Sequence, residues 1–187
     1  MDNNKTFYVD PKVYKDRPEN LKNRFEKEIR VYELLDSLGI DYERVDHDPA
    51  DTIEECEQVE KVIGKDICKN LFLCNRQMTK FYLLMMPGKK PFKTKDISNQ
   101  IGSARLSFAT SDKMLEFLDI TPGSVSVLGL ANDKEKAVQL LVDRDVYESE
   151  YVCCHPCINT STLKIKMKDI LEKFLPQTEH YPVMVEL

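Results

Sequence analysis

The chain has 187 residues, 42% hydrophobic and 32% charged, so it can bury one core of ordinary size and is not a disordered protein. Its 27 basic and 32 acidic residues give a net charge of −5, which argues against a protein that grips DNA along its length. It has no run of 18 apolar residues and no signal-peptide core, so we expect a cytoplasmic protein whose six cysteines are reduced.

The N-terminal part is expected to contain a polar arm and a long helix. Residues 1–16 are polar and aperiodic, and we interpret them as an arm in front of one domain that spans residues 17–187. From Pro18, which suits the first turn of a helix, apolar residues recur at steps of three and four. This pattern predicts an amphipathic helix that ends at Gly39.

The next segments predict an edge strand, a capped helix and a hairpin. Residues 41–46 alternate weakly between polar and apolar, as expected for an edge strand. A capping box at residues 52–55 opens a helix that is predicted to end near Gly64. Two apolar runs, 67–74 and 80–86, are joined by a short polar turn and predict an antiparallel hairpin.

The middle of the chain predicts two short helices and a second hairpin. Thr94 and Ser111 are expected to cap the two helices. The hairpin is expected to pair residues 124–130 with residues 137–142, because polar turn residues separate these apolar runs.

The remaining elements complete the predicted fold. Residues 150–154 and 163–167 predict two more strands, and a closing amphipathic helix is expected to end at Pro176. Short turns between neighbouring strands favour antiparallel pairing. We therefore predict a single α+β domain with a mixed, mostly antiparallel sheet and flanking helices. No G-x-G-x-x-G or Walker motif supports a doubly wound nucleotide-binding fold.

Charge is distributed unevenly along the chain. Residues 41–60 contain nine acidic residues and one arginine, a local net charge of −8. Residues 89–113 contain six basic and two acidic residues, a local net charge of +4. We interpret the acidic stretch as a solvated face. The basic stretch is either a second solvated face or a group of side chains that reach a phosphate backbone.

One short segment gathers three cysteines and a histidine: Cys153-Cys154-His155-Pro156-Cys157. Zinc sites usually combine two closely spaced pairs, and Cys68 and Cys74 are too far apart in sequence to form the second pair. A cysteine nucleophile beside His155 is another interpretation, since a thiolate needs a nearby base. Nothing in the sequence selects one thiol, and both remain minor alternatives to buried, unreactive cysteines.

Three polar features are candidates for ligand contact. Lys69 lies in an apolar strand, where burial of an unpaired ammonium group is costly, so its side chain must face solvent or an anion. The turn at residues 123–126 can present successive backbone N–H groups to an anion or a carbonyl oxygen. His155, followed by Asn159 and Thr162, lies on a loop that either lines a pocket or forms an ordinary turn.

Four sequence blocks together resemble one known family. They are Lys69-Asn70-Leu71-Phe72-Leu73, Gly102-Ser103-Ala104-Arg105-Leu106-Ser107-Phe108-Ala109, Pro122-Gly123-Ser124-Val125-Ser126, and His155-Pro156 with Asn159 and Thr162. On these blocks the chain resembles the YbaK and prolyl-tRNA synthetase editing-domain family, and within it the free-standing prolyl-tRNA deacylases of the ProX type. The resemblance extends over about residues 24–176.

The resemblance implies a fold, an activity and partners. The fold would be a mixed, partly barrel-like sheet with flanking helices. The activity would be hydrolysis of the ester bond of mischarged tRNA(Pro), with alanyl-tRNA(Pro) as the first choice of substrate. The expected partners are the acceptor end of an aminoacylated tRNA and prolyl-tRNA synthetase, with neither DNA nor a membrane. No cofactor and no metal are expected.

The resemblance also implies roles for individual residues. The expected catalytic set is Lys69, which would engage the phosphate and ribose of the terminal adenosine, with Gly123, Ser124 and Val125, whose backbone amides would hold the ester. The expected substrate-binding residues are Asn70, Arg105, Ser126, His155, Asn159 and Thr162. Of these, His155 and Asn159 would border the aminoacyl pocket, and a small pocket would admit alanine and exclude proline.

One position departs from the family pattern. The usual proline of the Gly-x-x-x-Pro motif is Val127 here, which keeps an N–H group and restricts φ less. The loop is therefore expected to be less preorganised. An aminoacyl ester is already activated, so amide donors and a water positioned by the ribose 2′-hydroxyl would suffice without a strong nucleophile. The alternative is a non-catalytic sensor of an amino acid or of charged tRNA.

Overall fold

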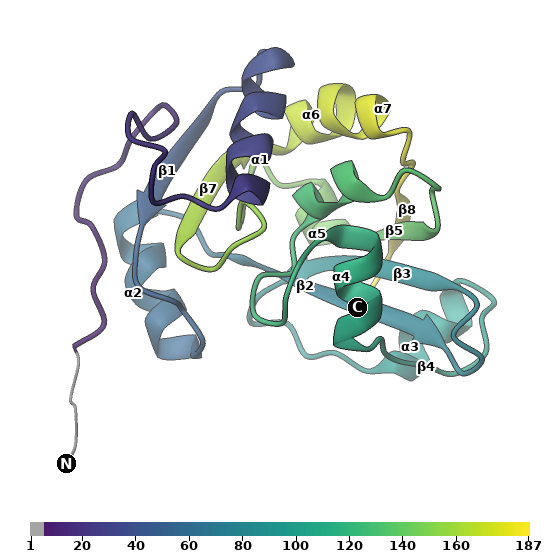
Figure 1. Cartoon of the computed structure of the whole chain (residues 1–187). Helices are drawn as coiled ribbons and strands as arrows, with labels where there is room; N and C mark the ends of the chain where they lie inside the picture. The colour runs from purple at the N-terminus through teal and green to yellow at the C-terminus, as the bar shows by residue number, and fades with distance from the viewer. Residues whose placement is uncertain (1–5) are drawn as a thin grey trace.

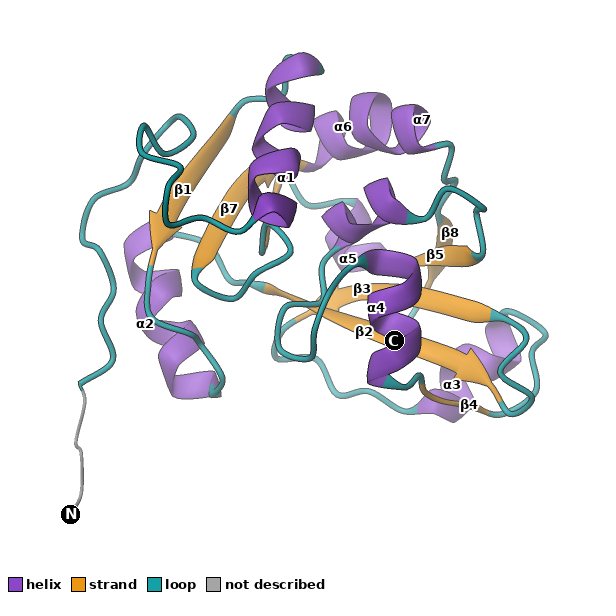
Figure 2. Cartoon of the chain, viewed as in Figure 1, coloured by secondary structure: helices purple, strands orange, loops and turns teal. Residues whose placement is uncertain are grey.

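The strands form two sheets, which are seen in the computed structural model (Figure 1, Figure 2). The structure describes residues 6–187. The smaller sheet has the order β1-β7-β6: β1 (Tyr42–Asp46), β7 (Ser161–Lys166) and β6 (Tyr151–Cys154). The larger sheet has the order β4-β2-β3-β5-β8: β4 (Leu106–Phe108), β2 (Cys68–Asn75), β3 (Phe81–Pro87), β5 (Val138–Asp143) and β8 (Val183–Val185).

Most strand pairs are antiparallel, as predicted. The exceptions are the pairs that β5 makes, because it runs parallel to both β3 and β8. The α+β class with flanking helices is confirmed, whereas the expected partial barrel is replaced by two open sheets. Strand β1 lies at the edge of the smaller sheet, as its weak alternation predicted.

Helices pack around both sheets. They are α1 (Glu26–Ser37), α2 (Ile53–Ile63), α3 (Thr94–Gln100), α4 (Ser111–Leu118), the 3₁₀ helix η1 (Val127–Asn132), α5 (Arg144–Tyr147), α6 (Met167–Asp169), the π-helical turn η2 (Ile170–Phe174) and α7 (Leu175–Thr178). Within residues 6–187, no helix has the length and apolar character required to cross a membrane.

The larger sheet is buried on both faces, and this explains the continuous apolar runs of β2 and β3. On one face Phe72 and Leu83 pack in a core that includes residues of α4. On the other face Leu73 and Leu84 pack with Ile97 of α3. A strand that is covered on both sides needs apolar residues at successive positions rather than at alternate ones. The predicted hairpin is confirmed, and its register pairs Lys69 with Met86.

The helix that precedes the hairpin begins and ends as predicted. The hydroxyl of Thr52 accepts a hydrogen bond from the Glu55 N–H at 3.2 Å, and the Glu55 carboxylate accepts one from the Thr52 N–H at 2.9 Å. This capping box fixes the start of α2, and Gly64 terminates the helix in the left-handed conformation. The first turn of α2 is therefore held rigidly at the edge of the cavity described below.

Three predicted helix limits are wrong for local reasons. Helix α1 starts at Glu26 rather than near Pro18, because the side chain of Asn20 accepts a hydrogen bond from the Lys22 N–H and forms a turn. Helix α4 is capped by Thr110, not by Ser111. The C-terminal helix continues past Pro176, which occupies the first turn of α7, where no N–H is needed.

Thr94 and residues 124–130 also differ from the prediction. Thr94 is the first residue of α3, and Lys93 occupies the capping position without a side-chain hydrogen bond. Residues 124–130 do not form a strand; instead η1 begins after Ser126, whose hydroxyl accepts a hydrogen bond from the Leu128 N–H at 3.2 Å. Strand β5 consequently pairs with β3 and β8.

The N-terminal arm is docked where the structure describes it. Residues 1–5 of the predicted arm lie outside the described residues. Val9 forms an isolated bridge with His47, and Tyr14 forms one with Arg44. The arm therefore extends the smaller sheet beyond its edge strand β1.

Candidate functional site

A cavity of about 680 Å³ lies between α2, the start of β2, the loop that follows β3 and the turn at Gly123. Five of the predicted site residues line it: Lys69, Asn70, Gly123, Val125 and His155. They come from three sequence blocks that are distant in the chain, so the fold brings together much of the predicted site. Gly88 permits the close approach of the loop after β3, because a Cβ there would lie 2.7 Å from the carbonyl oxygen of Ile67.

Lys69 and Asn70 form the part of the cavity that belongs to β2. The Lys69 side chain is exposed, as expected for an unpaired ammonium group in an apolar strand, and it forms no ion pair within residues 6–187. Asn70 donates a 3.3 Å hydrogen bond to the Cys68 carbonyl. Its Oδ1 is buried and accepts no hydrogen bond within the described chain, which leaves one acceptor for a ligand.

The turn at residues 121–127 supplies backbone donors, although fewer than the sequence suggested. Gly123 has a φ of +88°, a conformation that favours glycine. The Ser124 N–H donates to the Thr121 carbonyl at 3.1 Å, so this amide already has a partner. In the described structure, the N–H groups of Gly123 and Val125 make no hydrogen bond. The Ser126 hydroxyl is buried and caps η1, which is a structural role.

The His155 ring is held in place by a chain of buried hydrogen bonds. Its Nδ1–H donates to the Ser161 carbonyl at 2.9 Å, which leaves Nε2 unprotonated. Thr162, fully buried, lies 3.4 Å from the same Nδ1 and 2.9 Å from Nε2 of His47. Burial lowers the pKa of His155 to about 4 and also lowers the pKa of His47. Both rings are therefore neutral at pH 7, and Thr162 positions His155 instead of lining the cavity.

Asn159 contacts Asp51, a residue that was not among the predicted site residues. Its Nδ2 donates a 2.9 Å hydrogen bond to Oδ1 of Asp51, the residue just before the α2 capping box. Both side chains lie beside Gly123, since a Cβ built there would be 3.4 Å from Nδ2 of Asn159 and 3.5 Å from Oδ1 of Asp51. Asp51 lines the cavity. Its only sequence signal was its place in the acidic stretch, next to a helix start.

Arg105 is not brought to this cavity. It is exposed and directly precedes β4, which pairs with the far end of β2 through Leu106 and Asn75. Lys69 lies near the other end of β2, six residues before Asn75 and roughly 20 Å away at the usual rise of a strand. The structure therefore separates Arg105 from the other predicted site residues.

The cysteine side chains are thiols and form no disulfide within the described chain. All six are free, and Cys56 and Cys68 line the cavity. Burial raises the pKa of Cys68 to about 11 and raises that of Cys56, so neither is an activated thiolate at pH 7. Burial likewise raises the pKa of Cys157 to about 12. Across residues 6–187, no group of three histidine, cysteine or acidic side chains is arranged to hold a metal ion.

The lysines after β3 have different environments. Lys90 donates to both oxygens of the fully buried Asp143, at 2.9 and 3.0 Å, and therefore ties the cavity loop to the end of β5. Lys89 is 65% exposed and lies 3.8 Å from Glu60 and 3.6 Å from Asp66. Of these two lysines, Lys89 is the one whose charge remains accessible to a ligand.

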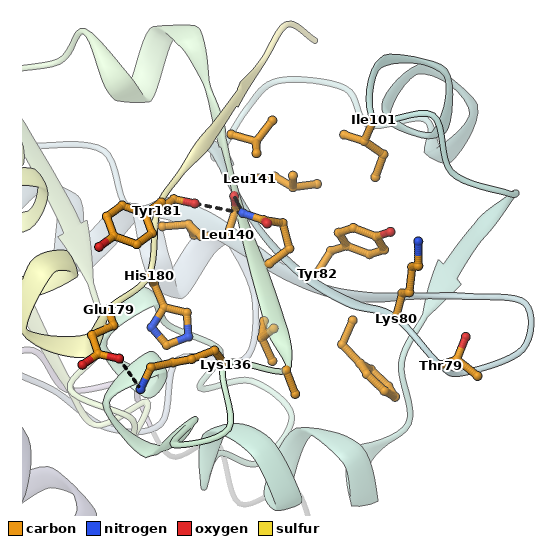
Figure 3. Close-up of a pocket in the computed structure, with 15 residues that line it drawn as sticks. Thr79, Lys80, Tyr82, Ile101, Lys136, Leu140, Leu141, Glu179, His180 and Tyr181 are labelled. Carbon is orange, nitrogen blue, oxygen red and sulfur yellow. Dashed lines mark hydrogen bonds and ion pairs between the residues drawn. The ribbon is translucent and has the colours of Figure 1, made fainter.

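A second cavity, of about 560 Å³, lies at the opposite end of β3 (Figure 3). Figure 3 shows Lys80, Tyr82 and Tyr181 around it, with Lys136 paired to Glu179. It contains none of the predicted site residues. Substitution of a lysine in this second cavity therefore provides a control for substitution of Lys69 in the first cavity.

Comparisons with known proteins identify the family of the chain. Residues 47–173, which include all the predicted site residues, match the family model for the aminoacyl-tRNA editing domain. The chain is 35% identical over 145 residues to prolyl-tRNA editing protein ProX of Acetoanaerobium sticklandii, covering 78% of this chain and 88% of that protein. It is 30% identical over 155 residues to prolyl-tRNA synthetase associated domain-containing protein 1 of Mus musculus, covering 81% and 90%.

A solved structure shows the same fold. It is the crystal structure of a candidate trans-editing enzyme for prolyl tRNA synthetase, with a TM-score of 0.63 over 87% of this chain and 98% of that one. The sequence identity is 15%, so this likeness concerns the fold alone.

Proposed function

The chain belongs to the aminoacyl-tRNA editing domain family, as its four sequence blocks predicted, and on this premise we propose that it is a trans-editing deacylase that acts on mischarged tRNA(Pro). We propose alanyl-tRNA(Pro) as its substrate. The observation that carries the proposal is the cavity in which Lys69, the Gly123 turn and His155 meet. Its donors and its accessible lysine suit the 3′ end of an aminoacylated tRNA.

In the proposed reaction, water attacks the carbonyl carbon of the ester. A new C–O bond forms to the water oxygen, and the bond from the carbonyl carbon to the ribose 3′ oxygen breaks. One proton of the water ends on the 3′ oxygen, so the products are the free amino acid and tRNA(Pro). The N–H groups of Gly123 and Val125 would stabilise the oxyanion, and one such donor typically contributes about 3 kcal/mol to catalysis.

The remaining predicted residues would hold the nucleotide and the acyl group. We propose that Lys69 binds the phosphate of the terminal adenosine, with Lys89 as a second cation, and that the free Oδ1 of Asn70 accepts from a ribose hydroxyl. His155 and Asn159 would border the aminoacyl group. Ile53, Cys68 and Pro91 contribute apolar walls to the cavity. We propose that these walls select the acyl group by its size and shape.

The proposed activity implies a place of action and partners. A free-standing deacylase meets its substrate in the cytoplasm, as charged tRNA leaves the synthetase, so we propose a transient association with prolyl-tRNA synthetase. The net charge of −5 predicts weak binding that is confined to the acceptor end.

The experiment is a deacylation panel with purified protein. Alanyl-, cysteinyl- and prolyl-tRNA(Pro) are incubated with micromolar protein, and release of the labelled amino acid is followed. We expect hydrolysis of the alanyl ester and little of the prolyl ester. Absence of hydrolysis of every mischarged tRNA(Pro) would refute the proposal, and tight binding without turnover would identify the sensor instead.

A further inference from the structure

The cavity has walls of opposite charge. The segment that leads into α2 and the helix itself contribute Asp51, Glu57 and Glu60, whereas β2 and the loop after β3 contribute Lys69 and Lys89. The strongly acidic and the basic stretches of the sequence therefore meet at one site. The acidic stretch was expected to be a solvated face, and this part of it faces a cavity instead.

Asp51 differs from the other two acids in how it is held. Its backbone N–H donates to Glu55 at 2.8 Å, and its Oδ1 accepts from Asn159 at 2.9 Å. The same oxygen lies 3.5 Å from the position of a Cβ on Gly123. Within the described chain, Oδ2 of Asp51 accepts no hydrogen bond and the carboxylate forms no ion pair. By contrast, Glu60 accepts from the Ile67 N–H and lies near Lys89.

We propose that Asp51 binds the α-ammonium group of the aminoacyl ester and thereby selects substrates with a free α-amino group. This inference rests on the proposed deacylase function. Standard bond lengths place the α-nitrogen about 2.5 Å from the carbonyl carbon. If the amides of Gly123 and Val125 hold the carbonyl oxygen, the ammonium group must lie close to them. Asp51 is the carboxylate fixed beside that turn.

The charge arrangement also gives the substrate one orientation. The 3′ end of an aminoacyl-tRNA carries a phosphate on one side of the ester and an ammonium group on the other. The lysines face the first charge and Asp51 the second, so reversed binding would bring like charges together. An acyl group without a positive charge would not be attracted to the Asp51 carboxylate.

The test compares alanyl-tRNA(Pro) with lactyl-tRNA(Pro), in which a hydroxyl replaces the amine. Each enzymatic rate is divided by the spontaneous hydrolysis rate of the same ester, because the ammonium group itself activates the ester. We expect the wild-type protein to favour the alanyl ester by about 10- to 100-fold, the range for one charge-assisted hydrogen bond. Asp51→Asn should bring this ratio close to one by slowing the alanyl ester, and Asp51→Glu should restore part of it.

The control variant is Glu54→Gln, which removes an exposed carboxylate of α2 that does not line the cavity. It should keep the wild-type ratio. Equal rate enhancement of both esters by the wild-type protein would overturn the inference while leaving the deacylase intact. An Asp51→Asn variant that slows both esters equally would also overturn it. Failure to hydrolyse either ester would refute the deacylase proposal itself, and this inference with it.

Discussion

Asn159 donates a 2.9 Å hydrogen bond from Nδ2 to Oδ1 of Asp51, a residue 108 positions earlier in the chain. The bond joins the loop between β6 and β7 to the start of α2, and Gly123 lies against both side chains. Three segments that the sequence separates are thus held at one end of the cavity. The spacing between the proposed amide donors and the residues proposed to border the acyl group therefore depends on this junction.

The junction predicts a specific effect of Gly123→Ala. A methyl group there would lie within 3.5 Å of the Asp51 and Asn159 side chains, and φ of +88° strains any L-residue. We expect about 1 kcal/mol of destabilisation and at least a tenfold loss of kcat/KM for alanyl-tRNA(Pro). The matched control is Gly102→Ala, which also has positive φ, +60°, but has open space around it. Equal activity of the two variants would contradict the role of the turn.

Lys69→Ala is expected to lower kcat/KM by about 10- to 100-fold, because it removes the proposed charge-assisted contact to the terminal phosphate. Lys80→Ala removes an exposed lysine of the second cavity and should leave the rate unchanged. The measurement is kcat/KM for the steady-state deacylation of alanyl-tRNA(Pro) by each of the two variants. If the two lysine variants behave alike, Lys69 does not contact the substrate.

Val127→Pro should be tolerated. Val127 is the first residue of η1, and its N–H makes no hydrogen bond within residues 6–187. Proline fits such a position and restricts the unfolded chain, but it also replaces a fully buried core side chain, so we expect the free energy of unfolding to change by less than about 1 kcal/mol. The Ser126 cap already holds the loop, so deacylation should change little. Urea unfolding checks the first expectation, and a clear loss of stability would show that valine is required there.

Much of the fold followed from local signals. The Thr52 capping box and the apolar runs of β2 and β3 predicted elements that the structure contains. The predicted strand at residues 124–130 failed because Ser126 offers the backbone a local hydrogen bond, which competes with sheet pairing. The parallel pairing of β5 with β3 joins segments that are far apart in the sequence, so no local sequence pattern predicts it.

The candidate site was predicted in part. Lys69, Asn70 and His155 were found because their sequence blocks resemble a family, and the fold brings them to one cavity. Asp51 was missed because its partners, Asn159 and Gly123, are defined only by tertiary packing. Arg105 belongs to an equally specific block, yet it lies beyond the other end of β2.

Stability is expected to fall in mild acid because of His155. Its pKa is about 4 in the folded protein and about 6.5 when unfolded, so the unfolded state binds the proton first as pH falls. Stability from this group is therefore complete above pH 6.5 and decreases as pH falls toward 4, by on the order of 3 kcal/mol. The neighbouring His47, whose pKa is also lowered by burial, acts in the same direction.

Urea unfolding at pH 7, 5.5 and 4.5 measures this dependence. The His155→Gln variant, which cannot titrate, should show a shallower fall in the free energy of unfolding than the wild-type protein. Parallel curves for the two proteins would mean that His155 is not buried in its neutral form.

The proposed deacylase activity is measured by the rate at which purified protein releases alanine from alanyl-tRNA(Pro), compared with the release of proline from prolyl-tRNA(Pro). We expect rapid release of alanine by micromolar protein and slow release of proline, with the alanine rate strongly reduced in Lys69→Ala. An alanine rate equal to that of the protein-free control would show that the protein is not a deacylase of alanyl-tRNA(Pro).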